Sequence, residues 1–338
     1  MAIKTLNNLL KFASQEKAEK MIISNNDNDL SCFMQLPLGE EANFKLPKKI
    51  SNDLLVSFRN LLKIAPEELT KDQYFKLEDK DYNLNFYLSI LSGKNGEKII
   101  MSLVKPKKEK INFNQLGLQA KTKNEIKTIL SKKSGLIIIV SEEQQGKSTT
   151  FYSFLNLLNK KEKNIYLLNN IPGEDLEDII QIKNQPENWE RLLKYDTDII
   201  AIEADTDIKI LEQAVIAANT GRLVIVSLKA VNSFEALFRL LSLSLPIPLI
   251  IENLKIVIAQ KLVTLKRVNQ ANKTKNKRQK IGIFEILKID KNIKKFIINN
   301  QATIRSQKFW RELARLSLKD NYQPFIIDEK KKKTDGLI

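Results

Sequence analysis

The stretch GLIIIVSEEQQGKSTTFYSFLNLLNK, residues 135–160, decides the fold. Its first six residues form a continuous apolar run, which is typical of a strand buried on both faces of a sheet. The run TTFYSFLNLLNK that ends the stretch predicts a helix. Between the two lies Gly146-Lys147-Ser148, where a strand would turn into a helix. Because backbone N–H groups and a helix N-terminus at such a turn bind phosphate oxygens, the stretch predicts a phosphate-binding loop.

The candidate nucleotide-binding residues are Gln144, Gln145, Gly146, Lys147, Ser148 and Thr149. In this role Lys147 would reach the β- and γ-phosphates of ATP, and the Ser148 hydroxyl would bind Mg²⁺. The pattern G-x-x-x-x-G-K-[ST] is met only in part, because Ser141 replaces its first glycine. Glu142 and Glu143 also place two carboxylates beside the expected phosphates, which is electrostatically unfavourable. The loop alone therefore leaves a second interpretation open, a turn whose Lys and Ser cap the next helix.

Short apolar strands alternate with helices from residue 116 onward, which predicts an α/β fold with a mainly parallel sheet. After the first strand, further strands are expected at 164–168, 198–202, 222–228 and 281–287. Residues 20–105 instead mix strands with one helix, expected over 51–64, and predict a small α+β domain. A basic, polar stretch at Asn269–Lys280 is expected to be an exposed loop.

Composition narrows the class of protein. A length of 338 residues suits about two domains. One cysteine, Cys32, and no histidine exclude an internal disulfide and the usual zinc and Cys-His sites. The lone cysteine suits the cytosol, so the chain is expected to be cytoplasmic. No apolar run is long enough to span a membrane. The net charge of +16 suits an anionic partner or reflects compositional bias, and nucleic acid is not expected because no aromatic residues interleave with the lysines.

Four stretches together resemble the secretion ATPases of type II secretion and type IV pilus assembly, over about residues 25–325. They are the opening stretch, DTDIIAIEADTDIKILEQAVIAANTGRLVIVSLKAVN (196–232), IENLKIVIAQKLV (251–263) and KIGIFEILKID (280–290). The resemblance implies a RecA-like P-loop NTPase core preceded by a small, PAS-like α+β domain. The expected divisions are an N-terminal helix (1–20), the PAS-like domain (21–107), a linker (108–118), the RecA-like nucleotide-binding domain (119–325) and a disordered basic tail (326–338).

The resemblance also implies ligands and partners. ATP and Mg²⁺ are the expected ligands, without zinc, because the family's four-cysteine loop would fall in Asn269–Lys280, which has no cysteine. The expected assembly is a homo-oligomer, or a mixed hexamer with an active paralogue. Its expected partner is the inner-membrane platform protein of a pilus or secretion system, which would place the chain at the inner face of the membrane.

Several family positions differ here. The acidic box reads Leu168-Asn169-Asn170-Ile171, and amides cannot act as general bases. The family's catalytic glutamate falls on Ala204, flanked by Glu203 and Asp205, which are the candidate catalytic carboxylates. Each is one residue out of register, and a one-residue slip turns a strand side chain to the opposite face unless a bulge restores it. Lys229 replaces the family's histidine and is a candidate phosphate sensor.

Three functions follow from these observations. The first is a degenerate subunit that binds nucleotide with weak or no hydrolysis and serves as partner or regulator of an active paralogue. The second is an active hexameric ATPase that powers assembly with displaced carboxylates, so the sequence leaves hydrolysis open. The third, a basic RecA-like protein that binds nucleic acid, has no recognisable reader motif.

Overall fold

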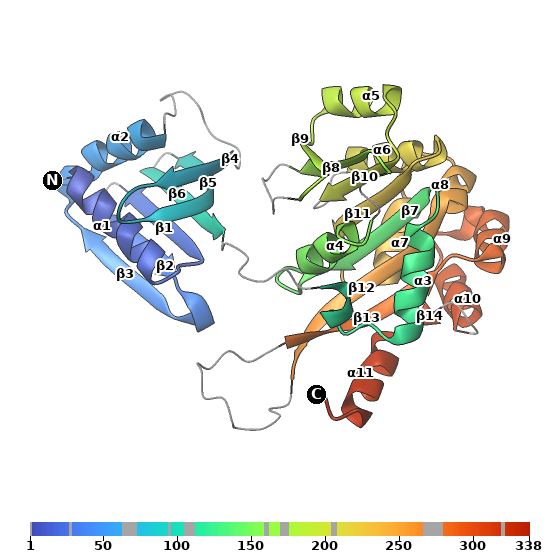
Figure 1. Cartoon of the computed structure of the whole chain (residues 1–338). Coiled ribbons are helices and arrows are strands. Elements are labelled where there is room, and N and C mark those ends of the chain that lie inside the picture. Colours follow the sequence, from blue (N-terminus) through green and yellow to red (C-terminus); the bar gives the residue numbers. More distant parts are fainter. Residues whose placement is uncertain are drawn as a thin grey trace. The chain divides into compact units, whose positions relative to one another are not determined.

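The computed structural model describes most of the chain (Figure 1). The described residues are 2–26, 29–62, 73–93, 96–104, 112–158, 162–169, 176–203, 208–265, 280–318 and 322–338. They form two compact units, Met1–Lys108 and Glu109–Ile338, and each is considered by itself. Within the described ranges, no helix is long and apolar enough to cross a membrane.

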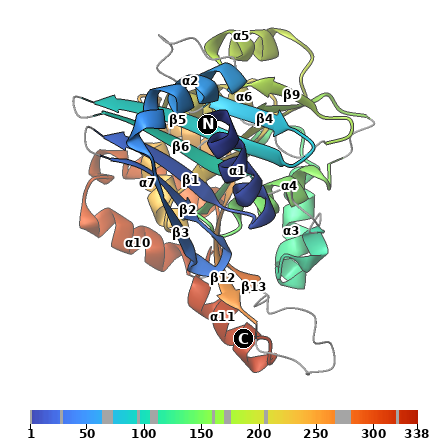
Figure 2. The ribbon, with the colours of Figure 1, turned by 90° about the vertical axis from the view of Figure 1, so that its left-hand side faces the viewer.

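The first unit is an antiparallel sheet with two helices on one face (Figure 2). Its strands are β1 (Lys20–Asn26), β2 (Leu30–Gln35), β3 (Glu41–Leu46), β4 (Gln73–Glu78), β5 (Asn83–Gly93) and β6 (Gly96–Val104). Its helices are α1 (Ala2–Gln15) and α2 (Ser51–Leu62), with short 3-10 helices η1 (Pro37–Gly39) and η2 (Lys48–Ile50). The described strands are arranged in the order β3-β2-β1-β6-β5-β4.

Helical spacing explains how this unit closes its core. In α1 the buried residues Leu6, Leu9, Leu10 and Ala13 recur at the three- and four-residue intervals of one helix face. They pack on the buried side of β1 and β2, which also holds Cys32. Burial raises the pKa of the Cys32 thiol to about 12, so this group is not a reactive thiolate.

The second unit is built on a mainly parallel sheet, in the order β14-β13-β12-β7-β11-β10-β8-β9 over the described residues. These strands are β7 (Gly135–Ser141), β8 (Ile165–Asn169), β9 (Ile180–Lys183), β10 (Ile199–Glu203), β11 (Leu223–Lys229), β12 (Leu254–Thr264), β13 (Lys280–Lys288) and β14 (Tyr322–Gln323). The strands from β12 to β9 run parallel, and β13 and β14 add antiparallel pairs at one edge. This confirms the predicted α/β class, a mainly parallel sheet preceded by a small α+β domain.

Helices cover both faces of this sheet. They are α3 (Ala120–Leu130), α4 (Lys147–Leu155), α5 (Pro186–Lys194), α6 (Ile208–Asn219), α7 (Ser233–Leu241), α8 (Ile247–Asn253), α9 (Lys291–Asn299), α10 (Gln307–Ser317) and α11 (Phe325–Thr334), with 3-10 helices η3 (Phe113–Gln115) and η4 (Gln301–Thr303). Ile137 and Ile139 of β7 lie on the sheet face that α3 and α4 cover. Ile138 lies on the opposite face, which α6 to α10 cover. Because β7 is buried on both faces, its apolar run is continuous.

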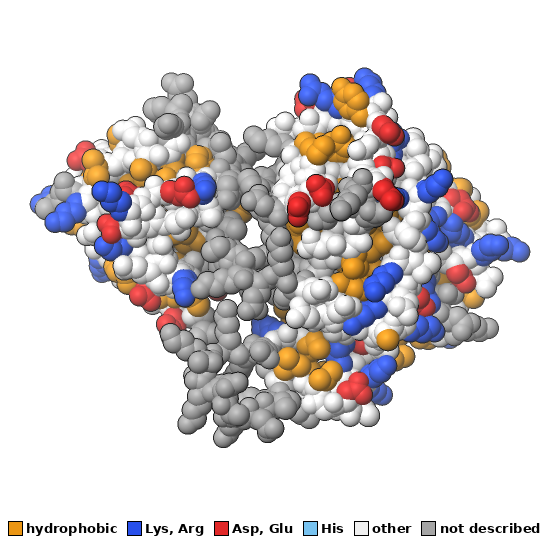
Figure 3. Space-filling model, in the orientation of Figure 1, with side chains coloured by type: hydrophobic (Ala, Val, Ile, Leu, Met, Phe, Trp, Pro, Cys, Tyr) orange, Lys and Arg blue, Asp and Glu red, His pale blue; other side chains and the backbone are white. Residues whose placement is uncertain are grey.

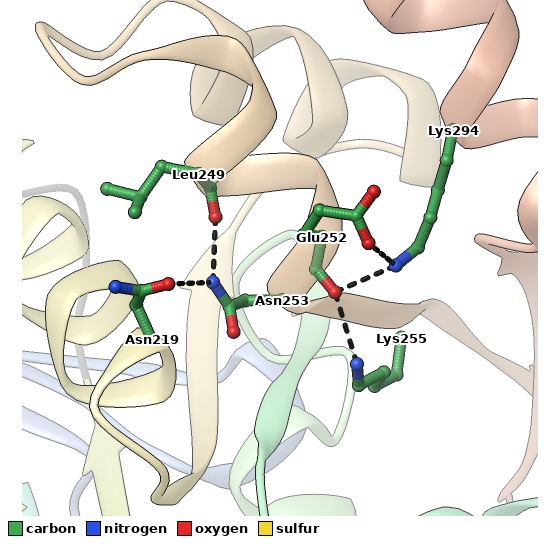
Figure 4. A network of polar contacts seen from close by, with 6 residues as sticks. All are labelled: Asn219, Leu249, Glu252, Asn253, Lys255 and Lys294. Carbon is green, nitrogen blue, oxygen red and sulfur yellow. Dashed lines mark hydrogen bonds and ion pairs between the residues drawn. The ribbon is translucent and has the colours of Figure 1, made fainter.

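Strand β12 is anchored where it begins, by polar contacts at the end of α8 (Figure 4). The backbone carbonyl of Glu252 accepts hydrogen bonds from the ammonium groups of Lys255 (3.1 Å) and Lys294 (2.8 Å). Lys294 also forms an ion pair with the Glu252 carboxylate at 2.7 Å. Burial, aided by the charges of Lys294 and Lys132, lowers the pKa of Lys255. Cations at a helix C-terminus are favourable, so these contacts fix the junction of α8 and β12.

The structure corrects the predicted linker between the two domains. The expected linker over 108–118 is too long, because Phe113, Leu116 and Leu118 are buried in the core of the second unit. These apolar side chains pack beneath α3 and α4. The Asn112 side chain caps η3. The basic loop expected at Asn269–Lys280 lies outside the described residues except for Lys280, where β13 begins.

The tail over 326–338 was expected to be disordered, and this is wrong, because its residues form most of α11. Asp328 on this helix is buried and accepts hydrogen bonds from the Phe284 backbone N–H (2.9 Å) and the Gln119 amide (2.9 Å). Its carboxylate also pairs with the buried ammonium of Lys332, one turn later. A run rich in lysine therefore folds because one buried carboxylate ties it to β13.

We expect Asp328→Ala to lower the free energy of unfolding of the second unit by about 3 kcal/mol, because it leaves Lys332 buried without its counter-ion. Chemical denaturation followed by circular dichroism measures this change. Glu329→Ala is the matched control, since it removes a more exposed pair with Lys333 on the same helix and should cost about 0–1 kcal/mol. Equal effects of the two variants would contradict the account of α11.

Candidate functional site

The carboxyl ends of the parallel strands meet at one edge of the sheet, where the predicted site residues gather. Strand β7 ends at Ser141 and α4 begins at Lys147, so residues 142–146 form the connecting loop. The neighbouring strand β11 ends at Lys229, which lies beside Ser141 in the register. The next strand, β10, ends at Glu203. In open parallel sheets, ligands bind outside these carboxyl ends.

The loop has a backbone conformation that glycine favours. Gly146 precedes α4 with φ +81°, and a Cβ atom there would lie 2.7 Å from the Gln260 side-chain nitrogen. Only glycine fits both the positive φ and the close approach. Gln144 also has a positive φ, of 59°, although it carries a side chain.

Gln260 of β12 holds the loop in place. Its side-chain nitrogen donates a hydrogen bond to the backbone carbonyl of Gln145 at 2.8 Å, and its side-chain oxygen accepts one from the buried Thr150 hydroxyl. The Leu262 backbone N–H donates to the Gln145 side-chain oxygen at 2.8 Å. The sequence analysis missed Gln260, although a polar residue within the apolar run of β12 was a usable signal.

Glu203 lies against α4. Ile199 and Ala201 of β10 pack on the side of α4, and the two-residue period of a strand places Glu203 on the same face. The Ser148 hydroxyl donates to one Glu203 carboxylate oxygen at 2.6 Å. The Tyr152 hydroxyl donates to the other at 3.1 Å. Two hydroxyls of α4 therefore orient this carboxylate, and Tyr152 is a site residue that the sequence analysis missed.

The oxygen atoms of Ser148 and Glu203 suit a magnesium ion. Mg²⁺ prefers hard oxygen ligands and is held in proteins by one or two carboxylates together with substrate phosphates. The Ser148 hydroxyl, one residue after the candidate phosphate-binding Lys147, and the Glu203 carboxylate to which it donates form such a donor set. Asp205, the second candidate carboxylate, lies outside the described residues together with Ala204.

Lys229 forms an ion pair with the loop. Its ammonium lies 2.5 Å from the Glu143 carboxylate, with side-chain exposures of 46% and 77%. The hydrogen bond and charge of Lys229, together with the charge of Lys147, lower the pKa of Glu143. The structure therefore places Lys229 at the predicted phosphate loop, in contact with a carboxylate of the chain itself.

The remaining predicted site residues lie at the start of α4 and at the end of β8. Lys147, Ser148 and Thr149 form the first turn of α4, and all three are partly buried. Asn169 ends β8, the strand next to β10, and its buried side-chain nitrogen donates to Gln181 at 3.2 Å. The acidic-box position Asn169 thus carries an amide that is paired within the sheet, while Asn170 and Ile171 lie outside the described residues.

Comparison with known proteins identifies the family. The profile described as "Type II/IV secretion system protein" matches residues 2–328. The chain belongs to this family. The type II secretion system ATPase E of Vibrio cholerae is 26% identical over 271 residues, which cover 77% of this chain and 54% of that protein. The type IV pilus assembly ATPase PilB of Acinetobacter baylyi is 28% identical over 207 residues, or 59% and 36% of the two chains.

Solved structures agree on the fold of this type II/IV secretion system protein. The Legionella pneumophila ATPase DotB aligns with a TM-score of 0.71 at 16% identity, covering 99% of this chain and 93% of DotB. The pilus retraction motor PilT with bound ADP aligns with a TM-score of 0.67 at 17% identity, covering 98% and 93%. This likeness concerns the fold alone, and the chain spans about half the length of the curated type II relatives it matches.

We expect Gln260→Ala to lower the free energy of unfolding of the second unit by about 1–3 kcal/mol, because the buried Thr150 hydroxyl loses its acceptor. Chemical denaturation measures the loss. Thr264→Ala, an exposed position at the end of the same strand, should change stability by less than about 0.5 kcal/mol. A Gln260 variant as stable as this control would show that the strand does not hold the loop.

We expect Lys229→Met to raise the pKa of Glu143 towards its ordinary value, because the cation that lowers it is removed. A carboxyl-carbon NMR titration of the two proteins measures the shift. Since the folded-state pKa is lowered, the pair stabilises the fold above the unfolded-state pKa of the carboxyl. That contribution is lost as pH falls through the lowered value. An unchanged pKa in the variant would mean that the ion pair does not form in solution.

Proposed function

We propose that this chain is the ATP-binding and ATP-hydrolysing subunit of a type II secretion or type IV pilus assembly machine, with Glu203 as the carboxylate on the magnesium side. The observation that carries the proposal is the 2.6 Å hydrogen bond from Ser148 to Glu203. It brings a carboxylate to the hydroxyl that a phosphate loop devotes to the metal. Glu203 lies one residue before the position of the family's glutamate, but it is on the face of β10 that packs against α4, where it reaches Ser148.

The chain's own residues divide the work at this site. Lys147 and the loop N–H groups of residues 144–149 bind the phosphates. The hydrogen bond from Gln260 to the Gln145 carbonyl keeps that loop in one conformation. Ser148 and Glu203 hold Mg²⁺, while Tyr152 fixes the second carboxylate oxygen. Bound Mg²⁺ neutralises charge on the phosphates and polarises a phosphoryl oxygen. Positioning and electrostatics of this kind supply most of the catalysis in phosphoryl transfer.

A second candidate function is a subunit that binds ATP without hydrolysing it and assists an active paralogue. Asn169 favours it, because an amide stands at the end of β8 where the resemblance implies an acid. Asp205 remains a further candidate carboxylate for the first function. Among the described residues on the face of the second unit shown in Figure 3, basic and acidic side chains are intermixed, so those residues offer no continuous basic surface for a nucleic acid.

The proposed setting follows from the relatives. We propose that the chain acts at the cytoplasmic face of the inner membrane, with the platform protein of a pilus or secretion system as its partner. The proposed assembly is a homo-oligomer, or a mixed hexamer with an active paralogue. Relatives named as a secretion ATPase and a pilus assembly ATPase support this setting.

ATP binding and turnover of three proteins separate the two functions. Lys147→Ala should abolish binding, because the phosphates lose their cation. Glu203→Gln should still bind ATP but turn it over about 10²–10³ times more slowly, the usual cost of removing one positioned group. Wild-type turnover of about 1 s⁻¹ is ordinary for an enzyme, and its loss in Glu203→Gln supports the first function.

Glu252→Gln serves as the control, since Glu252 pairs with Lys294 at the opposite end of β12 and should leave turnover unchanged. Background turnover by a wild-type protein whose ATP binding needs Lys147 would establish the second function instead. ATP binding that survives Lys147→Ala would contradict both.

A further inference from the structure

Two departures from the family pattern contact each other. Glu143 is an extra carboxylate in the phosphate loop, and Lys229 stands where the resemblance implies a histidine. The structure joins their side chains at 2.5 Å, across the carboxyl ends of the neighbouring strands β7 and β11. Glu143 alone is hard to reconcile with a phosphate site, but its charge is balanced where it pairs with Lys229.

The pair also involves the charges that a nucleotide would use. Lys147 contributes to the lowered pKa of Glu143, so this carboxylate lies within the electrostatic reach of both lysines. A triphosphate placed on the loop would meet the same two cations. Phosphate oxygens form strong, charge-assisted hydrogen bonds with ammonium groups, so the phosphates and Glu143 are rival partners.

The ion pair between Glu143 and Lys229 can break and re-form easily. Both side chains are open to solvent, with exposures of 77% for Glu143 and 46% for Lys229, and exposed pairs contribute little free energy. The loop does not depend on the pair alone for its shape, because Gln260 of β12 donates to the Gln145 backbone carbonyl and the Leu262 backbone N–H donates to the Gln145 side chain. Glu143 can therefore release Lys229 while the loop remains in place.

We propose that Glu143 competes with the terminal phosphate of a nucleoside triphosphate for Lys229, so that this pair sets the preference for ATP over ADP. The inference rests on the proposed nucleotide-binding function of the loop. Without nucleotide, Lys229 is held by Glu143. A γ-phosphate, which carries more charge and more acceptor oxygens than a carboxylate, would displace it, whereas a diphosphate lacks this group.

The test compares the affinities of the full chain for ADP and for an ATP analogue with a non-hydrolysable β–γ bridge, by calorimetry with Mg²⁺ present. The proteins are wild type, Glu143→Gln, Lys229→Met and the double variant. Glu142→Gln is the matched control, because it removes one negative charge from an exposed, adjacent position of the same loop. The ratio of the two affinities is the readout, since a general change in loop charge affects both nucleotides.

Glu143→Gln should raise the ratio of triphosphate to diphosphate affinity about two- to fivefold, the range that an exposed ion pair can supply. Lys229→Met should lower it, and Glu143→Gln should no longer change it in the Lys229→Met background. Equal changes in Glu142→Gln and Glu143→Gln would overturn the inference. A ratio that is insensitive to Lys229 would overturn it as well, while leaving the proposed function intact. If neither nucleotide binds to any of the proteins, the proposed function fails and the inference fails with it.

Discussion

The burial of β7 on both faces is the constraint on which the rest of the second unit depends. Its side chains alternate between two apolar clusters, one beneath α3 and α4 and one beneath α6 to α10. Burying an isoleucine side chain contributes about 1.5–3 kcal/mol, so the register of this central strand is strongly specified. The loop that follows β7 therefore has a fixed position at the carboxyl ends of the strands, between β11 and β12.

The site is assembled by the strands on either side of that loop. On one side, Gln260 of β12 holds the Gln145 carbonyl and accepts from Thr150. On the other side, β10 brings Glu203 to Ser148, and β11 brings Lys229 to Glu143. Each contact joins elements that are far apart in the chain. The unusual loop residues are therefore matched by unusual residues on the neighbouring strands.

The apolar runs of β7, β10 and β11 were enough to predict the parallel sheet, because strands buried on both faces leave a continuous signal in the sequence. The helix at the C-terminus could not be predicted in this way. Its Lys-rich sequence looks solvated, and only the tertiary contacts of Asp328 with Phe284 and Gln119 show that one face is buried. Local pattern is a poor guide where a single buried charge decides the structure.

The site was predictable in outline and not in its contacts. The loop residues 144–149 and the candidates Glu203 and Lys229 came from motif positions, and the structure gathers them at one edge. Aligned by its spacing, the sequence puts the family's glutamate at Ala204, so that Glu203 would point to the opposite face of the strand. That arithmetic omits the hydroxyls of Ser148 and Tyr152, which hold Glu203 from α4. Sequence spacing gives the face of a strand, whereas partners on another element decide what a side chain can do.

Glu203 is the proposed carboxylate on the metal side of the nucleotide site. This role can be measured by electron paramagnetic resonance of Mn²⁺, titrated into the wild-type chain and into Glu203→Gln with saturating ADP. We predict that the substitution weakens Mn²⁺ binding to the protein-bound nucleotide by at least about 10-fold, because even a group that only orients a metal ligand typically contributes about 10–100-fold to metal affinity. Equal Mn²⁺ affinity in the two proteins would contradict the account.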